Sequence, residues 1–316
     1  MSLKLAILDD YQGVAFSSAD WSALKGRVEI TRFRDHLDEE AKLVARLKPF
    51  DALLVMRERT PLPANILAKL DKLKLILSTG RRNAAIDVEA AKQRGITVCH
   101  TGYSSHGAAE HTWALILAAM RHIPAETASL KSGGWQRHVG IDLKGKVLGI
   151  VGLGNIGAKM AQVARAFDME VIAWSQNLTP EKAEAAGARA VDKETLFREA
   201  DIVTVHLILS GRSRGIVGAA ELALMKPSAW LVNSSRGPLV EEHALVRALE
   251  NRLIAGAALD VFDTEPLPAH HPFRRLDNVL ATPHVGFVTE QTYRIFYQDS
   301  VENLLAWLDD KPIRTV

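Results

Sequence analysis

The sequence predicts an α/β protein built from two doubly wound parallel-sheet domains, and three observations carry this prediction. The chain has 316 residues, which at about 150 residues per domain indicates two domains. Short, continuously apolar segments recur along it, as in strands that are buried on both faces of a parallel sheet. Segments with helical periodicity separate them, and the alternation of strand and helix is typical of α/β folds.

The first hundred residues contain five such apolar segments. We expect strands at Leu3–Leu8, Val28–Phe33, Ala52–Met56, Leu73–Ser78 and Ile96–Cys99. Helices are expected between them at Glu39–Leu47, Pro63–Leu70 and Val88–Arg94, the last stopped by Gly95. A long helix follows at about Gly107–His122, and Lys131-Ser132-Gly133-Gly134 has the composition of a loop.

A second series of strands and helices starts near residue 146. Strands are expected at Val147–Val151, Glu170–Trp174, Ile202–Leu207, Trp230–Asn233, Ala255–Leu259 and Val279–Ala281. Helices are expected at Ile156–Phe167, Glu181–Ala186, Lys193–Glu199, Ala219–Met225 and Glu241–Asn251. The amphipathic segment Glu290–Leu308 has no strand after it, so we expect it to return and pack on the first domain.

Composition narrows the class of function. Hydrophobic residues make up 47% of the chain, charged residues 24%, and the net charge is +2, which disfavours a protein that binds nucleic acid or membrane surfaces through bulk charge. Cys99 is the only cysteine, so neither a disulfide framework nor a cysteine-rich metal site is expected. The start of the chain lacks the pattern of a signal peptide. We therefore expect a cytoplasmic protein that acts on small molecules without a metal.

A glycine-rich turn joins the first strand and first helix of the second series. Gly152-Leu-Gly-Asn-Ile-Gly157 follows the strand directly, which is the context that gives G-x-G-x-x-G its meaning as a dinucleotide site. Gly152 permits a tight turn, Gly154 lets a pyrophosphate approach the backbone, and Gly157 lets helix and strand pack closely. Asn155 and Ile156 follow at the N-terminus of the helix, which offers free backbone N–H groups to the phosphates. Its expected buried stripe is Ile156, Met160, Val163, Ala164 and Phe167.

The residue at the end of the next strand bears on which dinucleotide is bound. An Asp or Glu about 20 residues beyond the fingerprint normally accepts the ribose 2′-hydroxyl and repels a 2′-phosphate. Ser175 stands there instead, and no Arg follows it immediately, although Lys182 and Arg189 are near in sequence. NAD(H) and NADP(H) therefore both stay open, and the missing carboxylate favours NADP or dual use.

Three polar residues follow neighbouring strands of the second series. Arg236 comes after Trp230–Asn233, Glu265 after Ala255–Leu259, and His284 after Val279–Ala281. Parallel strand ends meet at one edge of a sheet, so these side chains are expected to converge. Histidine is the natural acid or base near neutral pH, a carboxylate orients it and favours its protonated form, and the planar fork of arginine suits a carboxylate. The trio suits hydride transfer between a nicotinamide and a 2-hydroxy acid, whereas each residue taken alone also fits a structural role: a capping or ion-paired Arg, a surface Glu, and a loop His with satisfied hydrogen bonds.

These segments together resemble the D-isomer-specific 2-hydroxyacid dehydrogenase family, over nearly the whole chain. The resemblance is carried by the glycine-rich turn, Asn233-Ser-Ser-Arg-Gly-Pro238, Ala258-Leu-Asp-Val-Phe-Asp-Thr-Glu-Pro-Leu267, Thr282-Pro-His-Val-Gly286 and Ala109-Glu110-His111-Thr112. It implies a Rossmann NAD(P)-binding domain at 102–287, inserted in a flavodoxin-like substrate-binding domain formed by 1–101 and 288–316. It also implies a homodimer.

By the same resemblance, Arg236, Glu265 and His284 match the catalytic residues of the family. Ser235 and Asp260 match cofactor-binding positions, Asp260 at the nicotinamide carboxamide. The implied substrates are 2-keto acids and D-2-hydroxy acids such as glyoxylate, hydroxypyruvate or a relative of 3-phosphoglycerate. An NAD(H)-sensing, corepressor-like interaction protein is the alternative, because such proteins retain the same trio.

The chain departs from the family pattern in the loop expected to bind the substrate carboxylate. Ser78–Asp87 is usually richer in Gly, and Ala84 stands where an Asp is usual. Arg57, Thr79, Gly80, Arg81 and Arg82 are the expected substrate-binding residues, and the added arginines suit a second anionic group. The alternative is that these arginines face solvent or pair with Glu58.

Overall fold

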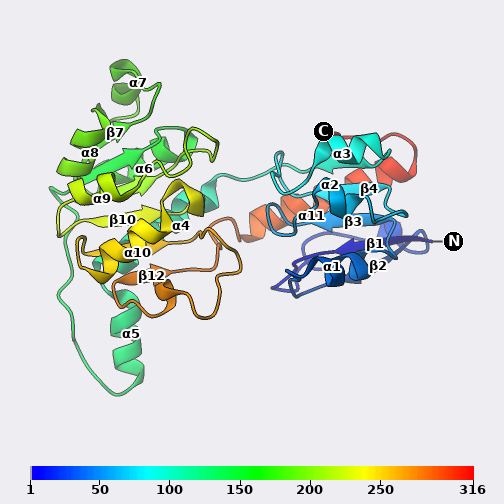
Figure 1. Ribbon diagram of the computed structural model, residues 1–316, viewed down its shortest axis with the longest axis horizontal. Helices are drawn as coiled ribbons and strands as arrows, with labels where there is room; N and C mark the ends of the chain where they lie inside the picture. Colours follow the sequence, from blue (N-terminus) through cyan, green and yellow to red (C-terminus); the bar gives the residue numbers. More distant parts are fainter. Residues whose placement is uncertain (1) are drawn as a thin grey trace. The chain divides into compact units, whose positions relative to one another are not determined.

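The computed structural model describes residues 2–316, and the chain divides into two compact units. One unit contains residues up to Ser104 together with Val288–Val316, and the other contains Ser105–Phe287. The first unit is thus made from both ends of the chain, and in Figure 1 it joins the blue and cyan segments to the red one. The second unit contains the green and yellow segments.

The first unit has a five-stranded parallel sheet with the strand order β2-β1-β3-β4-β5. The strands are β1 (Leu3–Ile7), β2 (Val28–Arg32), β3 (Ala52–Val55), β4 (Leu75–Ser78) and β5 (Thr97–His100). This is the strand order of flavodoxin-like folds, so the prediction for this part of the chain is confirmed. All five strands lie where the apolar segments predicted them, within two residues.

Alternate residues of these strands face two layers of helix. Leu53, Val55 and Ile76 pack with α1, α2 and α3 on one face. On the other face, α11 contacts β4 and has Phe296 and Tyr297 buried. The helices are α1 (Glu40–Leu47), α2 (Ala64–Leu67), α3 (Val88–Gln93) and α11 (Glu290–Leu308), with a 3-10 turn, η1, at Ser22–Leu24. The returning helix Glu290–Leu308 therefore packs on the first unit, as predicted.

The second unit has a seven-stranded parallel sheet in the order β12-β11-β10-β9-β6-β7-β8. The strands are β6 (Val147–Val151), β7 (Glu170–Trp174), β8 (Arg189–Ala190), β9 (Ile202–Val205), β10 (Trp230–Asn233), β11 (Gly256–Leu259) and β12 (Val279–Ala281). Counted within the unit, this is the Rossmann order with a seventh strand at the edge. The strand order reverses between β6 and β9, the point where such sheets bind ligands.

Helices cover both faces of this sheet. Met160 and Ile116 mark the face covered by α6 and α4, and Phe197 and Leu245 mark the face covered by α8, α9 and α10. The helices are α4 (His106–Met120), α5 (Ile123–Lys131), α6 (Asn155–Ala166), α7 (Pro180–Ala185), α8 (Lys193–Glu199), α9 (Ala219–Leu224) and α10 (Glu242–Glu250), with 3-10 turns η2 (Gly237–Leu239) and η3 (Pro272–Arg274). In the part of the chain that the structure describes, no helix has the length and apolarity needed to cross a membrane.

The structure differs from the expectations in four details. The helix α5 was not expected, because its apolar residues Ile123 and Leu130 face solvent and so leave no core-facing pattern. The short edge strand β8 was missed, and α2 is shorter than expected. On α6, Val163 and Phe167 are each 37% exposed, so the buried stripe consists of Gly157, Met160, Ala161 and Ala164.

Candidate functional site

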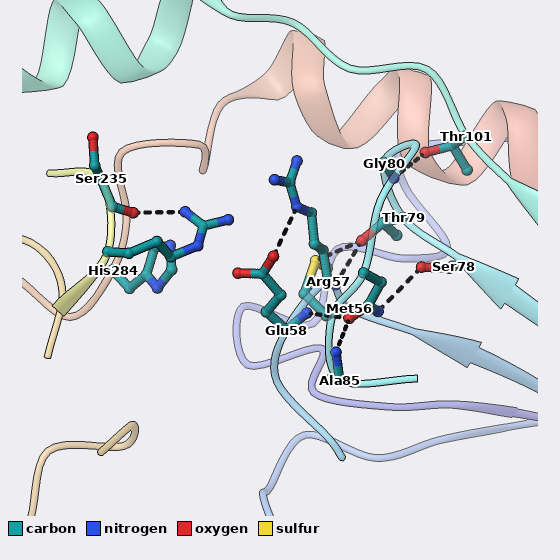
Figure 2. Close-up of polar contacts among 12 residues, drawn as sticks. Met56, Arg57, Glu58, Ser78, Thr79, Gly80, Ala85, Thr101, Ser235 and His284 are labelled. Carbon is teal, nitrogen blue, oxygen red and sulfur yellow. Dashed lines mark hydrogen bonds and ion pairs between the residues drawn. The ribbon is translucent and has the colours of Figure 1, made fainter. Parts of the chain in front are cut away.

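Arg236 lies on the loop that follows β10, at the carboxyl edge of the second sheet. The Asn233 side chain shapes this loop, because its amide donates to the carbonyl of Arg236 (2.9 Å) and its oxygen accepts from the amide of Ser235 (3.1 Å). The guanidinium of Arg236 donates to the carbonyl of Ser235 (2.6 Å), as the dashed line in Figure 2 shows. Ser235 is anchored in turn by a bond from its hydroxyl to Val205 (2.8 Å).

Gly237 brings this loop against the loop that follows β11. A Cβ atom on Gly237 would collide with the backbone carbonyl of Phe262, so only glycine permits the approach. The amide of Phe262 donates to Oε1 of Glu265 (2.9 Å). The close packing of these two backbones therefore fixes the strand-end loops that carry Arg236 and Glu265.

His284 and Glu265 form a direct pair. Nδ1 of His284 donates to Oε2 of Glu265 at 2.6 Å, and both side chains are mostly buried. The His284 ring also contacts Phe287 edge to face, with 5.6 Å between ring centroids. His284 has a φ of +51°, a left-handed conformation that is uncommon for a residue with a side chain. Figure 2 shows His284 and Ser235 on loops of the same unit.

Asp260 organises the loop on either side of His284. Its carboxylate is 1% exposed and accepts bonds from the amides of Val285 (2.9 Å) and Gly286 (2.8 Å) and from the hydroxyl of Thr282 (2.6 Å). Burial alone would raise the pKa of Asp260, but hydrogen bonds, chiefly from His111, hold that pKa below its ordinary value. Asp260 is therefore a buried carboxylate that sets the conformation of the His284 loop.

The glycine-rich turn has the geometry that a dinucleotide requires. Gly152 has a φ of +104°, and a Cβ there would lie 2.8 Å from the backbone of His206. A Cβ on Gly157 would collide with the carbonyl oxygen of Gly152, whereas a Cβ on Gly154 would meet nothing within 4 Å. The turn is therefore closed on its protein side and open above Gly154, where α6 begins. These residues fit the pyrophosphate of NAD(P).

A pocket of about 510 Å³ continues from this turn, within the size range of small-molecule sites. One wall is formed by the end of β7 and the residues after it, Trp174 to Asn177, and includes Ser175. In the sheet β6 lies between β7 and β9, and residues of the segment that follows β9, from His206 to Ile216, form the opposite wall. Burial lowers the pKa of His206 to about 4, so this histidine is neutral near pH 7.

In the first unit, Arg57 and Gly80 lie at the carboxyl edge of its sheet, after β3 and β4. The backbone amide of Arg57 donates to the hydroxyl of Thr79 (2.8 Å), and the amide of Gly80 donates to the hydroxyl of Thr101 (2.8 Å; Figure 2). Gly80 has a φ of +78°, and a Cβ there would lie 3.1 Å from the Arg57 side chain. Glycine thus leaves room for the arginine.

The remaining expected substrate residues differ in exposure. Thr79 is fully buried, and its hydroxyl also contacts the sulfur of Met56 (3.4 Å), so this side chain supports the loop from within. Arg81 and Arg82 are exposed, and across residues 2–316 neither side chain forms an ion pair or hydrogen bond. The arginine that lies near Glu58 is Arg57, with 3.7 Å between Nε and Oε1.

Two polar networks of this unit were missed by sequence reasoning. Asn83 accepts from the amide of Glu58 (3.0 Å) and donates to the hydroxyl of Ser78 (3.1 Å), joining the loops that follow β3 and β4. Asp9 lies 2.8 Å from Nδ1 of His36 and accepts from the hydroxyl of Thr60 (2.7 Å). The bond to Asp9 raises the pKa of His36. The residues of both networks lie in segments that follow strands, and this position is the sequence signal that could have identified them. Within residues 2–316, no three His, Cys, Asp or Glu side chains gather to hold a metal.

Comparisons with known proteins identify the family of the chain. Residues 113–286 match the model of the D-isomer specific 2-hydroxyacid dehydrogenase, NAD binding domain. A glyoxylate reductase from Aeropyrum pernix is 37% identical over 279 residues, which cover 85% of this chain and 83% of that protein. A D-3-phosphoglycerate dehydrogenase from Methanocaldococcus jannaschii is 43% identical over 257 residues, covering 80% of this chain. The chain spans about half the length of that dehydrogenase.

Solved structures extend the similarity over the full chain. A putative D-3-phosphoglycerate dehydrogenase oxidoreductase from Ralstonia solanacearum superposes with a TM-score of 0.94 at 38% identity, covering 100% of this chain and 97% of that one. These relatives are named as dehydrogenases and reductases, which does not favour a corepressor-like interaction protein.

Proposed function

We propose that this chain, which belongs to the D-isomer specific 2-hydroxyacid dehydrogenase family, interconverts a 2-keto acid and the corresponding D-2-hydroxy acid with a nicotinamide cofactor. The observation that carries the proposal is the His284–Glu265 pair, held at 2.6 Å in the same α/β unit as the glycine-rich turn. A dinucleotide turn and an oriented imidazole are the two parts that this chemistry needs.

His284 is the proton donor in the direction of reduction. Since Nδ1 donates to Glu265, Nε2 is the nitrogen that delivers a proton to the carbonyl oxygen of the substrate. The carboxylate of Glu265 holds the ring in this orientation and balances the positive charge of its protonated form. In the reverse direction, His284 takes the proton from the hydroxyl group. The nicotinamide, when bound, supplies or accepts the hydride.

Arg236 is proposed to bind the substrate carboxylate and the polarised carbonyl oxygen with its planar donors. The second unit is proposed to be the cofactor domain, in which Gly152, Gly154, Asn155, Ile156 and Gly157 hold the pyrophosphate. Ser175, Ser235 and Asp260 are proposed to complete that cofactor site. The Asp260 carboxylate already accepts hydrogen bonds from the backbone amides of Val285 and Gly286, which follow His284. Its proposed contact with the nicotinamide would come in addition to this structural role.

The first unit is proposed to be the substrate domain. Arg57 and the backbone at Thr79 and Gly80 are the candidates for contact with an acid group of the substrate. The exposed side chains of Arg81 and Arg82 are candidates for a second anionic group, as in a phosphorylated 2-hydroxy acid. For the cofactor, we propose NADP(H) or dual use, which is supported by the lack of a carboxylate after β7.

A panel of 2-keto acids assayed with NADH and with NADPH tests the proposed activity. We expect turnover of glyoxylate or hydroxypyruvate, seen as loss of reduced cofactor. Arg81→Ala and Arg82→Ala are expected to raise KM for a phosphorylated substrate about tenfold or more and to change KM for glyoxylate little, because only the former carries a second anion. If no keto acid is turned over while the cofactor binds tightly, the proposed activity is wrong.

A homodimer and a cytoplasmic location complete the proposal. Helix α5 and the segment after it extend from the rest of the second unit in Figure 1, and they expose Ile123, Leu130, Trp135 (73%) and Val139 (91%). Bonds such as that from the Ser129 hydroxyl to Trp135 (2.9 Å) order this arm, so its apolar residues suit a partner copy. The free, buried thiol of Cys99 supports a reducing compartment.

Substitution of the arm tests the dimer. Leu130→Asp combined with Trp135→Ala is expected to convert a dimer to a monomer in sedimentation equilibrium, because charge is placed in an apolar contact. Leu253→Asp, at another exposed leucine (41%) outside the arm, is the control and is expected to stay dimeric. A wild-type chain that sediments as a monomer contradicts the homodimer.

A further inference from the structure

The pocket beyond the glycine-rich turn has two walls of different origin. Ser175 stands on one wall, at the position that normally faces the ribose 2′-oxygen of a dinucleotide. Arg212 stands on the other wall, in the segment that follows β9. The strand order reverses between β6 and β9, so this segment borders the same crevice as the turn.

Arg212 is the only cation near neutral pH among the residues that line this pocket. His206 is neutral there because its pKa is about 4, and no Asp or Glu lines the pocket. Arg212 is exposed, and no ion pair or hydrogen bond of its side chain is present in residues 2–316. The positive charge of Arg212 is therefore available to an anionic ligand. No carboxylate among the lining residues neutralises that charge or repels such a ligand.

The first two cations that follow Ser175 in sequence, Lys182 and Arg189, are placed differently. Arg189 pairs with Glu199 at 2.8 Å, and neither Arg189 nor Lys182 lines this pocket. Arg214, two residues beyond Arg212, also does not line it. Lys193 lies 5.7 Å from the centroid of the Trp174 ring, but it pairs with Glu221 at 2.8 Å and does not line the pocket. Of the basic side chains around the end of β7, Arg212 is thus the one that the pocket presents to a bound dinucleotide.

We propose that Arg212 and Ser175 form a subsite for the 2′-phosphate of NADP(H), with the arginine reaching from the wall opposite to the usual position. This proposal rests on the proposed use of a nicotinamide dinucleotide. It adds the residue that sets the preference for NADP(H) over NAD(H). The Ser175 hydroxyl donates to a phosphate oxygen where a carboxylate would repel it, and the Arg212 guanidinium supplies charge-assisted hydrogen bonds. Arg212 is thus a specificity-determining residue.

Equilibrium binding separates this subsite from catalysis. Isothermal titration of the full chain with 2′-phospho-ADP-ribose and with ADP-ribose needs no turnover, so it gives a result even where no keto acid is reduced. We expect the wild-type chain to bind the phosphorylated compound at least as tightly as ADP-ribose. Arg212→Ala is expected to weaken the phosphorylated compound about tenfold or more and ADP-ribose by less than about twofold.

Three further variants sharpen the test. Arg212→Glu is expected to weaken 2′-phospho-ADP-ribose more than Arg212→Ala does, because it adds repulsion. Arg214→Ala and Lys182→Ala are the matched controls and are expected to change neither affinity by more than about twofold. Raising the salt concentration is expected to weaken the phosphorylated compound more than ADP-ribose in the wild-type chain, and this difference is expected to shrink in Arg212→Ala.

Several outcomes would overturn the proposal. One is a wild-type chain that binds 2′-phospho-ADP-ribose about tenfold more weakly than ADP-ribose. Another is an Arg212→Ala chain that binds 2′-phospho-ADP-ribose and ADP-ribose more weakly by the same factor. That result would mean that Arg212 stabilises the pocket for the adenosine part and does not recognise the 2′-phosphate. The third is a selective loss of the phosphorylated compound in Lys182→Ala with none in Arg212→Ala.

Discussion

His284→Asn is expected to lower kcat for keto acid reduction by about 10²- to 10⁴-fold, the usual contribution of a positioned acid or base. The reason is that an asparagine amide cannot transfer the proton that the imidazole, held by Glu265 at 2.6 Å, is proposed to supply. Asparagine is chosen because His284 has a φ of +51°, which Asn tolerates better than Ala. Single-turnover rates of cofactor oxidation measure the loss directly.

Cofactor binding provides the control for this variant. The bonds that hold the loop run from Asp260 to the backbone of Val285 and Gly286, and they do not involve the His284 side chain. We therefore expect NADH and NADPH affinities within about twofold of wild type, and the parallel variant His284→Ala to lose activity equally. A kcat that stays near the wild-type value in both variants would remove His284 from the catalytic role.

Arg236→Lys is expected to lower kcat/KM by about 10²-fold or more, although it keeps the positive charge. A lysine offers a point charge without the planar fork that binds carboxylate and carbonyl oxygens together. It also cannot reproduce the geometry of the 2.6 Å bond to the carbonyl of Ser235. Steady-state kinetics with glyoxylate or hydroxypyruvate measure the effect.

Chemical rescue distinguishes substrate binding from a structural role of Arg236. In Arg236→Ala, added guanidinium ion is expected to restore part of the lost activity, because it supplies the missing planar donor. Arg198→Lys, in an exposed pair with Glu194 at 2.6 Å, is the matched control and is expected to leave kcat/KM unchanged. Equal losses in Arg198→Lys and Arg236→Lys would contradict a specific role for Arg236.

Most of the fold was predictable because its signals are local. Buried parallel strands appear as short apolar segments, and the helix Glu290–Leu308 has the bounds that its amphipathic pattern predicts. Helix α5 was not predictable in the same way, because its apolar residues are exposed and do not repeat along a face that packs on the core. Val163 and Phe167 show a related limit: helical spacing identifies a stripe, but the neighbouring layer decides where burial stops.

The site divides along the same line. Arg236, Glu265 and His284 were predicted as a group because each follows a strand, and parallel strands bring their ends to one edge. The contacts that set their positions join segments far apart in sequence. Gly237 against Phe262, Asp260 beneath the His284 loop and Asn83 between two loops all depend on the assembled fold. The position of Arg212 could not be predicted from the sequence either, because the pocket that it lines is formed by two segments that only the folded chain brings together.

The configuration of the product tests the proposed D-2-hydroxy acid chemistry most directly. The keto acid that is turned over fastest among those that give a chiral product, such as hydroxypyruvate, is reduced to completion, and the 2-hydroxy acid is resolved by chiral chromatography. We predict that the D enantiomer is formed in large excess and that its rate of formation falls by about 10²- to 10⁴-fold in His284→Asn. Formation of the L enantiomer, or of no 2-hydroxy acid from any keto acid, would contradict this prediction.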